Sequence, residues 1–348
     1  MISYTQYMAK IKNNLLLITQ KIHSKDDDLA FVILWIDEFV KQGFNVTVIC
    51  LEKGDFSDSF PVYSLGKERG NGRILRALIF LKHIFTLRYD KVFIHMNPEY
   101  FTLGGWYWKL RNIPSYLWYT HYKNHIHLKI AFLMARRIFA ATDQSLPQYK
   151  TSQKRIITGH GIDISFWRNA ATEVGPSRDE FQLLVVSRVC RSKRIDICLK
   201  ALLCLDTRYR LTVYGRPVEK DYYEELIDFV KKEGLQHRVR FAGPVPMSEL
   251  KNIYGNYGLF LNMAYETIDK TMLEAMIFGL YPVTTKANSI AIGLPIYPED
   301  DKPETLAEFI RQKKWKSLSK DSLCSIVEEK HSLSALISKM REYIITGK

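Results

Sequence analysis

Residues 258–283 read GLFLNMAYETIDKTMLEAMIFGLYPV, and this stretch decides the fold. The run GLFLN is short and apolar, as expected of a strand that is buried on both faces of a parallel sheet. Residues 271–278 are good helix formers, and Thr271 can cap them because Glu274 stands at the capping-box spacing. Gly279 ends the helix, and YPV opens another strand. The stretch therefore predicts strand, loop, helix and strand within an α/β sheet.

The loop 263–270 leads from the carboxyl end of a strand to the N-terminus of a helix. Free N–H groups and the positive end of the helix dipole make such a place an anion site. Glu274, one turn inside the helix, can accept hydrogen bonds from a ribose diol, and Glu266 on the loop can hold a second polyol. This pattern suggests a nucleotide sugar as the ligand. In the alternative interpretation, Glu274 only closes a capping box and Glu266 is a solvated side chain.

Strands and helices alternate along the chain in two series, which predicts two doubly wound α/β domains. The 348 residues are enough for two separate cores. A polar, irregular linker is expected near 165–178. Strands are expected at 13–19, 44–51, 61–65, 90–96, 115–121 and 137–142, and then at 181–187, 210–214, 239–243, 258–262 and 281–285. Helices are expected near 29–42, 72–87, 98–110, 125–136, 194–204, 219–233, 246–256, 271–278 and 332–345.

The composition is that of an ordinary globular protein, with 47% hydrophobic and 25% charged residues. The apolar run Leu29–Ile36 is far too short to span a bilayer, and the first fourteen residues lack the continuous apolar region of a signal peptide. The five cysteines form no CxxC motif, which favours free thiols over a disulfide framework or a zinc site. We expect a cytoplasmic protein, either free or peripheral on the cytoplasmic face of the membrane.

Five segments, in order and spacing, resemble the retaining GT-B glycosyltransferases of family 4, the glycosyl transferases group 1. Glu266 and Glu274 match the E-x7-E segment of that family. Arg188 and Lys193 match its Arg-x4-Lys pattern, which follows a strand. The other three segments are KRIITGHGIDISFW (154–167), RLTVYGRP (210–217) and VRFAGPVPMSELKNIYGNYGLFLN (239–262). The resemblance is strong over about half of the chain and holds only in outline over the first 150 residues.

The resemblance implies a GT-B fold, in which two Rossmann-like doubly wound domains face each other across a cleft. We expect an acceptor-side domain at 1–168, completed by a crossing helix at 332–348, and a nucleotide-sugar domain at 169–331. In the family, the residues at Arg188 and Lys193 neutralise the leaving diphosphate. The implied donor-binding residues are Arg188, Lys193, Gly215, Gly243, Val245, Glu266, Lys270, Thr271, Met272 and Glu274, and the implied catalytic residues are His121, Glu266, Arg188 and Lys193.

His121 is the candidate on the acceptor side, because it ends the strand SYLWYTH (115–121) and resembles the family histidine that reaches the transferred sugar. His121, His125 and His127 also suggest a metal, but the spacing H-x3-H-x-H brings no carboxylate or cysteine partner. We therefore predict no metal site and no cofactor. His95 is a weaker candidate, for which a satisfied core or rim position is expected.

The loop HSKDDDLA (23–30) departs from the family, in which a Gly-Gly pair usually follows the first strand. Three acids near a diphosphate would repel it, so this loop either contacts a polyhydroxyl acceptor or has lost the donor contact. Its run of aspartates superficially resembles the metal-binding DxD of GT-A transferases, but its position favours capping of a helix from Leu29. Residues 267–270 likewise replace a small, glycine-bearing sequence; there Lys270 is a candidate charge contact to the donor, and Asp269 a reader of a sugar hydroxyl.

The net charge of +13 is concentrated in the first half of the chain, where residues 1–175 carry 23 basic and 14 acidic side chains. Residues 101–150 contain seven Lys/Arg and the single acid Asp143, interleaved with several aromatic residues. Such a mixture suits an anionic membrane surface or an acidic glycan. Nucleic acid is unlikely because no recognition motif is present. In the alternative interpretation, the aromatic side chains belong to the core and the charges to a solvated face.

We expect a metal-independent hexosyltransferase that moves a sugar from a nucleoside diphosphate, such as UDP or GDP, to a hydroxyl of a glycan or lipid-linked acceptor. Two alternatives stay open: a nucleotide-sugar 2-epimerase on the same fold, and an inactive GT-B nucleotide-binding module. A dinucleotide oxidoreductase is disfavoured because no GxGxxG follows the first strand. The base, the sugar and the acceptor are set by loop side chains and pocket shape, so the sequence leaves them open.

Overall fold

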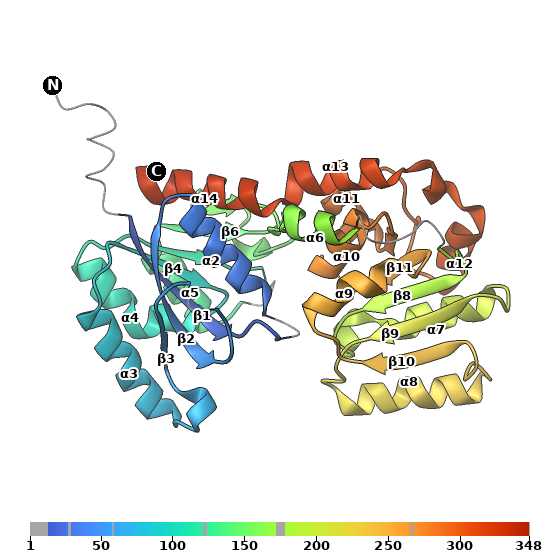
Figure 1. The fold of residues 1–348 in the computed structure, drawn as a ribbon, viewed down its shortest axis with the longest axis horizontal. Helices are drawn as coiled ribbons and strands as arrows, with labels where there is room; N and C mark the ends of the chain where they lie inside the picture. Colours follow the sequence, from blue (N-terminus) through green and yellow to red (C-terminus); the bar gives the residue numbers. More distant parts are fainter. Residues whose placement is uncertain are drawn as a thin grey trace. The chain divides into compact units, whose positions relative to one another are not determined.

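The chain folds into two compact α/β units, shown as a ribbon in Figure 1. The first unit consists of residues 1–161 together with 333–348, and the second of residues 162–332. The computed structural model describes residues 13–26, 29–57, 59–120, 124–171, 178–265 and 268–347, except for the side chains of 169–171.

The first unit is built on a seven-stranded sheet with the order β3-β2-β1-β4-β5-β6-β7. Neighbouring strands run parallel throughout. The chain builds one side of the sheet from β1 outward to β3, then returns to the other side of β1 with β4. The strands are β1 (Asn14–Ile22), β2 (Asn45–Lys53), β3 (Val62–Ser64), β4 (Lys91–His95), β5 (Ser115–Trp118), β6 (Arg137–Ala140) and β7 (Arg155–Ile157).

Helices cover both faces of this sheet. Leu15 and Leu17 of β1 pack into one core with α2 and α14, whereas Leu16 and Ile18 pack into the other with α3, α4 and α5. This alternation follows from the two-residue period of a strand and explains why the middle of β1 is apolar on both faces. The helices are α2 (Phe31–Lys41), α3 (Arg73–Thr86), α4 (Glu99–Leu110), α5 (Ile126–Met134) and α14 (Leu333–Thr346), with the short turns η1 (Lys67–Arg69) and η2 (Pro147–Tyr149).

The last helix of the chain completes the first unit. Leu336, Ile337, Met340 and Ile344 of α14 are at most 1% exposed and belong to the same core as α2. The Tyr116 hydroxyl of β5 donates to the Tyr343 carbonyl at 3.2 Å. Figure 1 shows α14, at the red end of the colour range, beside α2 near the blue end.

The second unit contains a five-stranded parallel sheet with the order β10-β9-β8-β11-β12. Its strands are β8 (Gln182–Val186), β9 (Arg210–Tyr214), β10 (Val239–Gly243), β11 (Leu259–Asn262) and β12 (Tyr281–Thr284). Its helices are α6 (Ile164–Ala171), α7 (Ile195–Cys204), α8 (Lys220–Lys232), α9 (Met247–Tyr254), α10 (Lys270–Ile277), α11 (Lys286–Ile292), α12 (Pro303–Gln312) and α13 (Lys320–His331), with η3 (Arg191–Lys193) and η4 (Lys314–Ser317).

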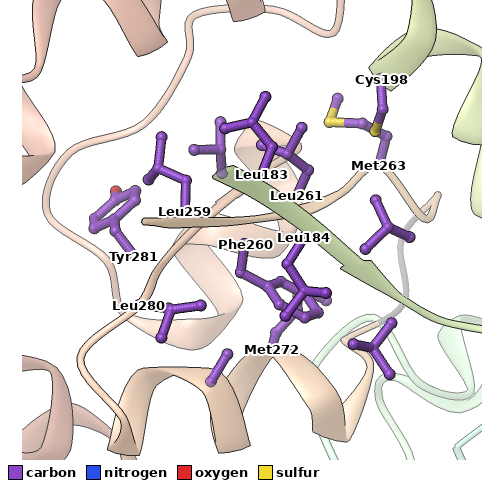
Figure 2. Packing of buried hydrophobic residues seen from close by; sticks show 14 of the residues in the cluster. Leu183, Leu184, Cys198, Leu259, Phe260, Leu261, Met263, Met272, Leu280 and Tyr281 are labelled. Carbon is purple, nitrogen blue, oxygen red and sulfur yellow. The ribbon is translucent and has the colours of Figure 1, made fainter. Parts of the chain in front are cut away.

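The central strands of the second unit, β8 and β11, are almost wholly apolar. Figure 2 shows Leu183 and Leu184 of β8 among Leu259, Phe260 and Leu261 of β11. All five side chains have no exposed surface. Burial on both faces fixes the two strands at the centre of the sheet, and hence the positions of the loops that follow them.

The structure confirms the two doubly wound α/β units that the alternation predicts, and it adds elements that the sequence pattern did not reveal. Strand β7 and helices α6, α11, α12 and α13 were not expected. Helix α6 occupies residues 164–171 and so overlaps the region 165–178 that was predicted as an irregular linker. Helix α2 begins at Phe31 with Ala30 as its N-cap, two residues later than expected.

Candidate functional site

The order of strands in the second sheet places its ligand-binding edge between β8 and β11. From β8 the chain proceeds to β9 and β10 on one side, whereas β11 and β12 lie on the other. Ligands of open parallel sheets bind at the carboxyl ends of the strands where the order reverses. Arg188 and Lys193 follow β8, and Asp269, Lys270 and Glu274 follow β11. These residues therefore follow β8 and β11, the two strands between which the strand order reverses.

An ion pair joins the two loops at this edge. The Lys193 ammonium lies 2.5 Å from Oδ1 of Asp269, with only 9% and 18% of the two side chains exposed. The other carboxylate oxygen of Asp269 accepts a hydrogen bond of 2.7 Å from the Asn262 amide. Oδ1 of Asn262 in turn accepts from the Ala264 N–H at 3.0 Å. Both oxygens of Asp269 are thus engaged, and the start of the loop after β11 is held by the end of the strand.

Asp269 is the N-cap residue of α10, but its side chain does not cap the helix. The capping box expected from Thr271 and Glu274 is therefore wrong. The Thr271 hydroxyl instead donates at 2.9 Å to the Val186 carbonyl at the end of β8, which ties the helix to the neighbouring strand. Without a side-chain cap from Asp269, the N-terminus of α10 keeps the donor capacity and positive dipole end of an anion site.

Glu274 is a buried carboxylate, only 5% exposed. Its Oε2 accepts a hydrogen bond of 3.0 Å from the hydroxyl of Tyr254, a residue of α9 with no exposed surface. Burial raises the pKa of Glu274 above its usual range, while the Tyr254 hydrogen bond and the Lys270 charge act in the opposite direction. Burial likewise lowers the pKa of Lys270, one helical turn earlier, against the attraction of Glu274. Helix α10 thus begins with a half-buried lysine and carries a buried carboxylate one turn later.

Arg188 stands apart from these contacts. Arg188 is exposed, and its side chain forms no hydrogen bond or ion pair with the residues that the structure describes. The nearby Arg191, by contrast, is held on the surface by Glu225 at 2.6 Å and Asp221 at 3.1 Å. A guanidinium without such partners at a strand's carboxyl end remains available to an anionic ligand.

Three predicted donor-binding residues, Gly215, Gly243 and Val245, lie at or just after the carboxyl ends of β9 and β10, and their surroundings differ. A Cβ on Gly215, where φ is +150°, would lie 1.7 Å from the Ser187 carbonyl oxygen, so only glycine fits there. Gly243 has φ of +79°, with open space where a Cβ would point. Val245 is half-buried and packs against the core. The close approach at Gly215 brings the backbone after β9 onto the end of β8.

Met272 is part of the core, where Figure 2 shows its side chain below Phe260 and Leu184. The side chain has no exposed surface, and the backbone N–H bonds to the Asp269 carbonyl at 3.0 Å. Its predicted donor contact therefore cannot come from the side chain. The described part of the site shows it as a packing residue that anchors the first turn of α10.

Comparisons with known proteins agree with this architecture. Residues 168–292 match the family model described as Glycosyl transferases group 1. Over 140 residues the chain is 29% identical to one of the subunits of the phosphatidylinositol N-acetylglucosaminyltransferase of Arabidopsis thaliana, a match that covers 39% of this chain and 30% of that protein. The matched part thus spans less than a third of that relative.

Solved structures match nearly the whole chain. HepE (Alr3699) of Anabaena, in complex with UDP-glucose, aligns with a TM-score of 0.74 at 16% identity, covering 95% of this chain and 99% of that one. Sucrose-phosphate synthase of Thermosynechococcus elongatus aligns with a TM-score of 0.74 at 14% identity, covering 94% and 98%. The fold is the GT-B fold of glycosyltransferases.

Two predicted catalytic residues of this GT-B chain, His121 and Glu266, lie outside the described residues, as does Thr267. The two remaining histidines of the predicted cluster have separate partners. His125 shares a hydrogen bond of 3.2 Å with the Tyr119 hydroxyl, and His127 one of 2.8 Å with the Thr102 hydroxyl. Within the described residues, no three His, Cys, Asp or Glu side chains come together as metal ligands would.

Two further predictions concern His95, in the core of the first unit, and the aspartates of the loop that follows β1. His95 is 2% exposed and stacks on Trp118 at 5.2 Å between ring centroids, which places its ring in the core. Oδ1 of Asp26 accepts from the Leu29 N–H at 2.8 Å and Oδ2 pairs with Lys21 at 2.9 Å, so Asp26 does not cap α2. Asp27 and Asp28 lie outside the described residues.

The aromatic residues interleaved with charge near 101–150 are mostly core residues. Six of them are Tyr100, Trp106, Tyr107, Trp108, Trp118 and Tyr119. Of these, Tyr100, Trp108, Trp118 and Tyr119 are at most 7% exposed. Trp106 alone is largely exposed, at 48%. Most of these aromatic side chains thus belong to the core, as in the alternative interpretation. None of the helices within the described residues combines the length and hydropathy that a bilayer span requires.

Sequence reasoning missed two residues that the structure brings to the GT-B site. Asn262 holds Asp269, and Tyr254 holds Glu274. Asn262 is the polar end of an otherwise apolar strand, a signal that was visible in the sequence. Tyr254 lies twenty residues before Glu274, and only the packing of α9 beside the sheet brings the two together, so no local pattern could reveal it.

Proposed function

We propose that this protein is a retaining glycosyltransferase of family 4 that moves a hexose-type sugar from a nucleoside-diphosphate sugar to a hydroxyl of a glycan or lipid-linked acceptor. One observation carries the proposal: the segment that matches the family model, residues 168–292, contains the charged residues described above at the β8/β11 edge, namely Arg188, Lys193, Asp269, Lys270 and Glu274. The UDP-glucose bound in the HepE complex supports UDP as the first nucleotide to test.

The proposed roles follow from the geometry of that edge. The diphosphate would lie at the N-terminus of α10, where the helix dipole and the cations Arg188 and Lys193 stabilise the charge that develops on the leaving group. Glu274 would accept hydrogen bonds from the ribose, and Glu266 would orient the sugar. Because these groups supply the positive charge, the proposed reaction is independent of metal and needs no cofactor.

The acceptor side of the proposal rests on the first unit. His121 would reach the transferred sugar, and contact of the basic first unit with a membrane would bring the enzyme to a lipid-linked acceptor. Retention, the hexose and the acceptor class enter from the family resemblance. They require a product analysis, in which the anomeric configuration of the transferred sugar is read by NMR.

A thermal-shift panel of UDP, GDP, ADP and dTDP, each with and without magnesium, tests the donor site. A nucleotide at a hundred times its dissociation constant should stabilise the protein by about 2.7 kcal/mol, a shift of a few degrees. We expect one base to act without magnesium, Glu274→Ala to lose the shift, and Glu224→Ala, on the exposed side of α8, to keep it. If no nucleotide shifts the wild type, the donor-site assignment is wrong.

Transfer itself is tested with the nucleotide sugar that corresponds to the preferred base. Slow release of free sugar, or transfer to a hydroxyl acceptor, would support the proposal. A protein that binds the nucleotide yet turns over no donor under any acceptor screen would be a nucleotide-binding module instead.

A further inference from the structure

Helix α3 turns an apolar face to solvent. Its contacts with the core of the first unit come from the buried residues Phe80 and Ile84 and from the half-buried Ile79 and Leu81. Four other large apolar side chains of the helix are exposed: Ile74 (80%), Leu75 (48%), Leu78 (58%) and Phe85 (49%). A surface helix normally shows polar residues to water and apolar residues to the core, so this arrangement requires an explanation.

The exposed side chains of α3 form one stripe. At about 100° per residue, Ile74, Leu78 and Phe85 fall within roughly 40° of one another, and Leu75 and Lys82 border them on one side. Phe80 and Ile84 lie on the other side of the helix. Leu81, which is half-buried against the core, borders the stripe on its remaining side. The apolar stripe therefore extends the core-facing side of α3 out into solvent.

The stripe continues onto α4. The Phe85 ring lies 6.2 Å from that of Trp106 and 4.8 Å from that of Tyr107, between centroids. Trp106 is 48% exposed and Leu110 is 76% exposed. Figure 1 shows α3 and α4 beside each other in the first unit. We call the exposed residues Ile74, Leu75, Leu78, Phe85, Trp106 and Leu110 the α3–α4 surface.

Apart from Glu99, at the start of α4, the charged residues on α3 and α4 are all basic. Neither residues 69–89 nor residues 100–142 contain an aspartate or glutamate. The basic residues on these helices and just beyond them form no ion pair with the residues that the structure describes; they are Arg73, Arg76, Lys82, Arg88, Lys109 and Arg111.

We propose that the α3–α4 surface binds an anionic lipid bilayer, with its apolar side chains entering the interface and its cations meeting the headgroups. Apolar side chains with a tryptophan, bordered mainly by cations, are the composition of interfacial membrane helices. A second copy of the chain would oppose like charges in a two-fold contact, which disfavours self-association. The binding does not depend on the proposed transferase activity.

The expected strength is that of a reversible peripheral contact. Each Lys or Arg near an anionic surface contributes about 1 kcal/mol, which corresponds to about fivefold in the partition coefficient. That part is screened within a Debye length, so high salt should weaken it, while the apolar part should persist. Substitution of one apolar residue by a glutamate removes an inserting group and adds repulsion from the headgroups.

Vesicle sedimentation tests the proposal with phosphatidylcholine vesicles and with vesicles that contain about 30% phosphatidylglycerol, enough to give an anionic surface. We expect the wild type to sediment with the anionic vesicles and much less with the neutral ones. The variant Leu78→Glu with Phe85→Glu should bind at least tenfold more weakly. The matched control is Ile290→Glu, whose side chain in the second unit has the same 58% exposure as Leu78 and should leave binding unchanged.

Two triple variants test what the cations contribute to vesicle binding. Arg88→Ala, Lys109→Ala and Arg111→Ala together should lower binding about a hundredfold, at about fivefold for each charge. Lys220→Ala, Lys232→Ala and Arg240→Ala, which remove the same charge from the second unit, should have little effect. All variants are exposed-site changes, so circular dichroism and thermal unfolding should match the wild type.

Two outcomes would overturn the proposal. One is a wild type that binds neither vesicle, or a double glutamate variant that binds as the wild type does. The other is a wild-type dimer, found by light scattering, that the double glutamate variant converts to a monomer, because the surface would then be a protein interface. Nucleotide thermal shifts of the same preparations, measured without lipid, report separately on the donor site.

Discussion

The Lys193 ammonium lies 2.5 Å from Oδ1 of Asp269, and this pair links the loops that follow the two strands at the switch point of the second sheet. Lys193 is also the residue proposed to neutralise a leaving diphosphate. In the ligand-free chain its charge is already met by a carboxylate. A diphosphate must therefore share Lys193 with Asp269 or displace Asp269 from it.

Replacement of Asp269 by asparagine should raise the affinity for nucleotide. Without the carboxylate, the whole charge of Lys193 is available to the diphosphate, and we expect UDP to bind about tenfold more tightly, in line with one charge-assisted hydrogen bond. The ligand-free variant should lose about 1–3 kcal/mol of stability, because Lys193 is left partly buried without a counter-charge. Titration calorimetry and thermal unfolding measure the two effects.

The matched control is Asp301→Asn, which breaks the 2.7 Å pair between Arg194 and Asp301 in the same unit. It should leave nucleotide affinity unchanged. Weaker UDP binding by Asp269→Asn would instead mean that Asp269 itself helps to hold the ligand.

Loss of either donor-site cation should slow transfer. Arg188→Ala or Lys193→Ala removes charge that stabilises the leaving diphosphate, at a cost on the order of a hundredfold in kcat. Steady-state kinetics with the preferred donor give the value. Arg191→Ala is the control, since Arg191 is held by surface carboxylates, and a loss of rate there as large as for Arg188 would contradict the assignment.

Nucleotide affinity should rise with pH through neutrality. Burial raises the pKa of Glu274, so part of the ligand-free protein holds this side chain protonated near neutral pH, whereas a ribose diol requires the ionised acceptor. Binding should then release a proton from Glu274. Isothermal titration in buffers of different ionisation enthalpy measures this release, and Glu274→Gln should abolish it. An unchanged proton release in Glu274→Gln would assign it to the nucleotide or to another group.

The second unit should lose stability as the pH falls below about 6.5 because of His331. This histidine is 3% exposed, its Nε2 lies 3.3 Å from the Ile292 carbonyl, and burial lowers its pKa to about 4. Between about pH 6.5 and 4 the unfolded chain takes up a proton that the folded chain does not. The contribution of His331 to stability is thus complete above about pH 6.5 and falls by up to about 3 kcal/mol towards pH 4.

Urea unfolding at several pH values tests this dependence. His331→Gln should flatten the acid side of the stability curve, whereas substitution of the exposed His237 by glutamine should leave its slope as it is. An identical slope in wild type and His331→Gln would assign the acid sensitivity to other groups.

Two glycine substitutions should differ sharply in how much they lower the free energy of unfolding. Gly215→Ala places a methyl group 1.7 Å from the Ser187 carbonyl oxygen and forces the end of β8 to move, at a cost of roughly 3 kcal/mol or more. Gly243→Ala meets open space and is destabilised only by its positive φ, by about 1 kcal/mol. Urea midpoints of the two variants measure the difference. Equal midpoints would show that the backbone after β9 relaxes freely.

The two sheets could be predicted from the sequence because their central strands are apolar on both faces, which makes runs such as residues 14–18 easy to recognise. The predicted cap of α10 was wrong, since Thr271 had a better acceptor in Val186, a residue that is distant in the chain. Helix α3 was located correctly, but an apolar stripe looks the same whether it faces core or water. For the same reason the pattern could not separate the core ring of Trp108 from the exposed ring of Trp106.

The position of α14 determines when the first unit can complete its core during synthesis. Residues 333–347 leave the ribosome after the whole second unit, yet the side chains of α14 fill the core beside α2. During translation, this part of the core of the first unit stays uncovered until α14 has been made, whereas the second unit already has all of its own strands. A shortened message that ends after α13 would therefore yield a chain whose defect lies in the unit made first.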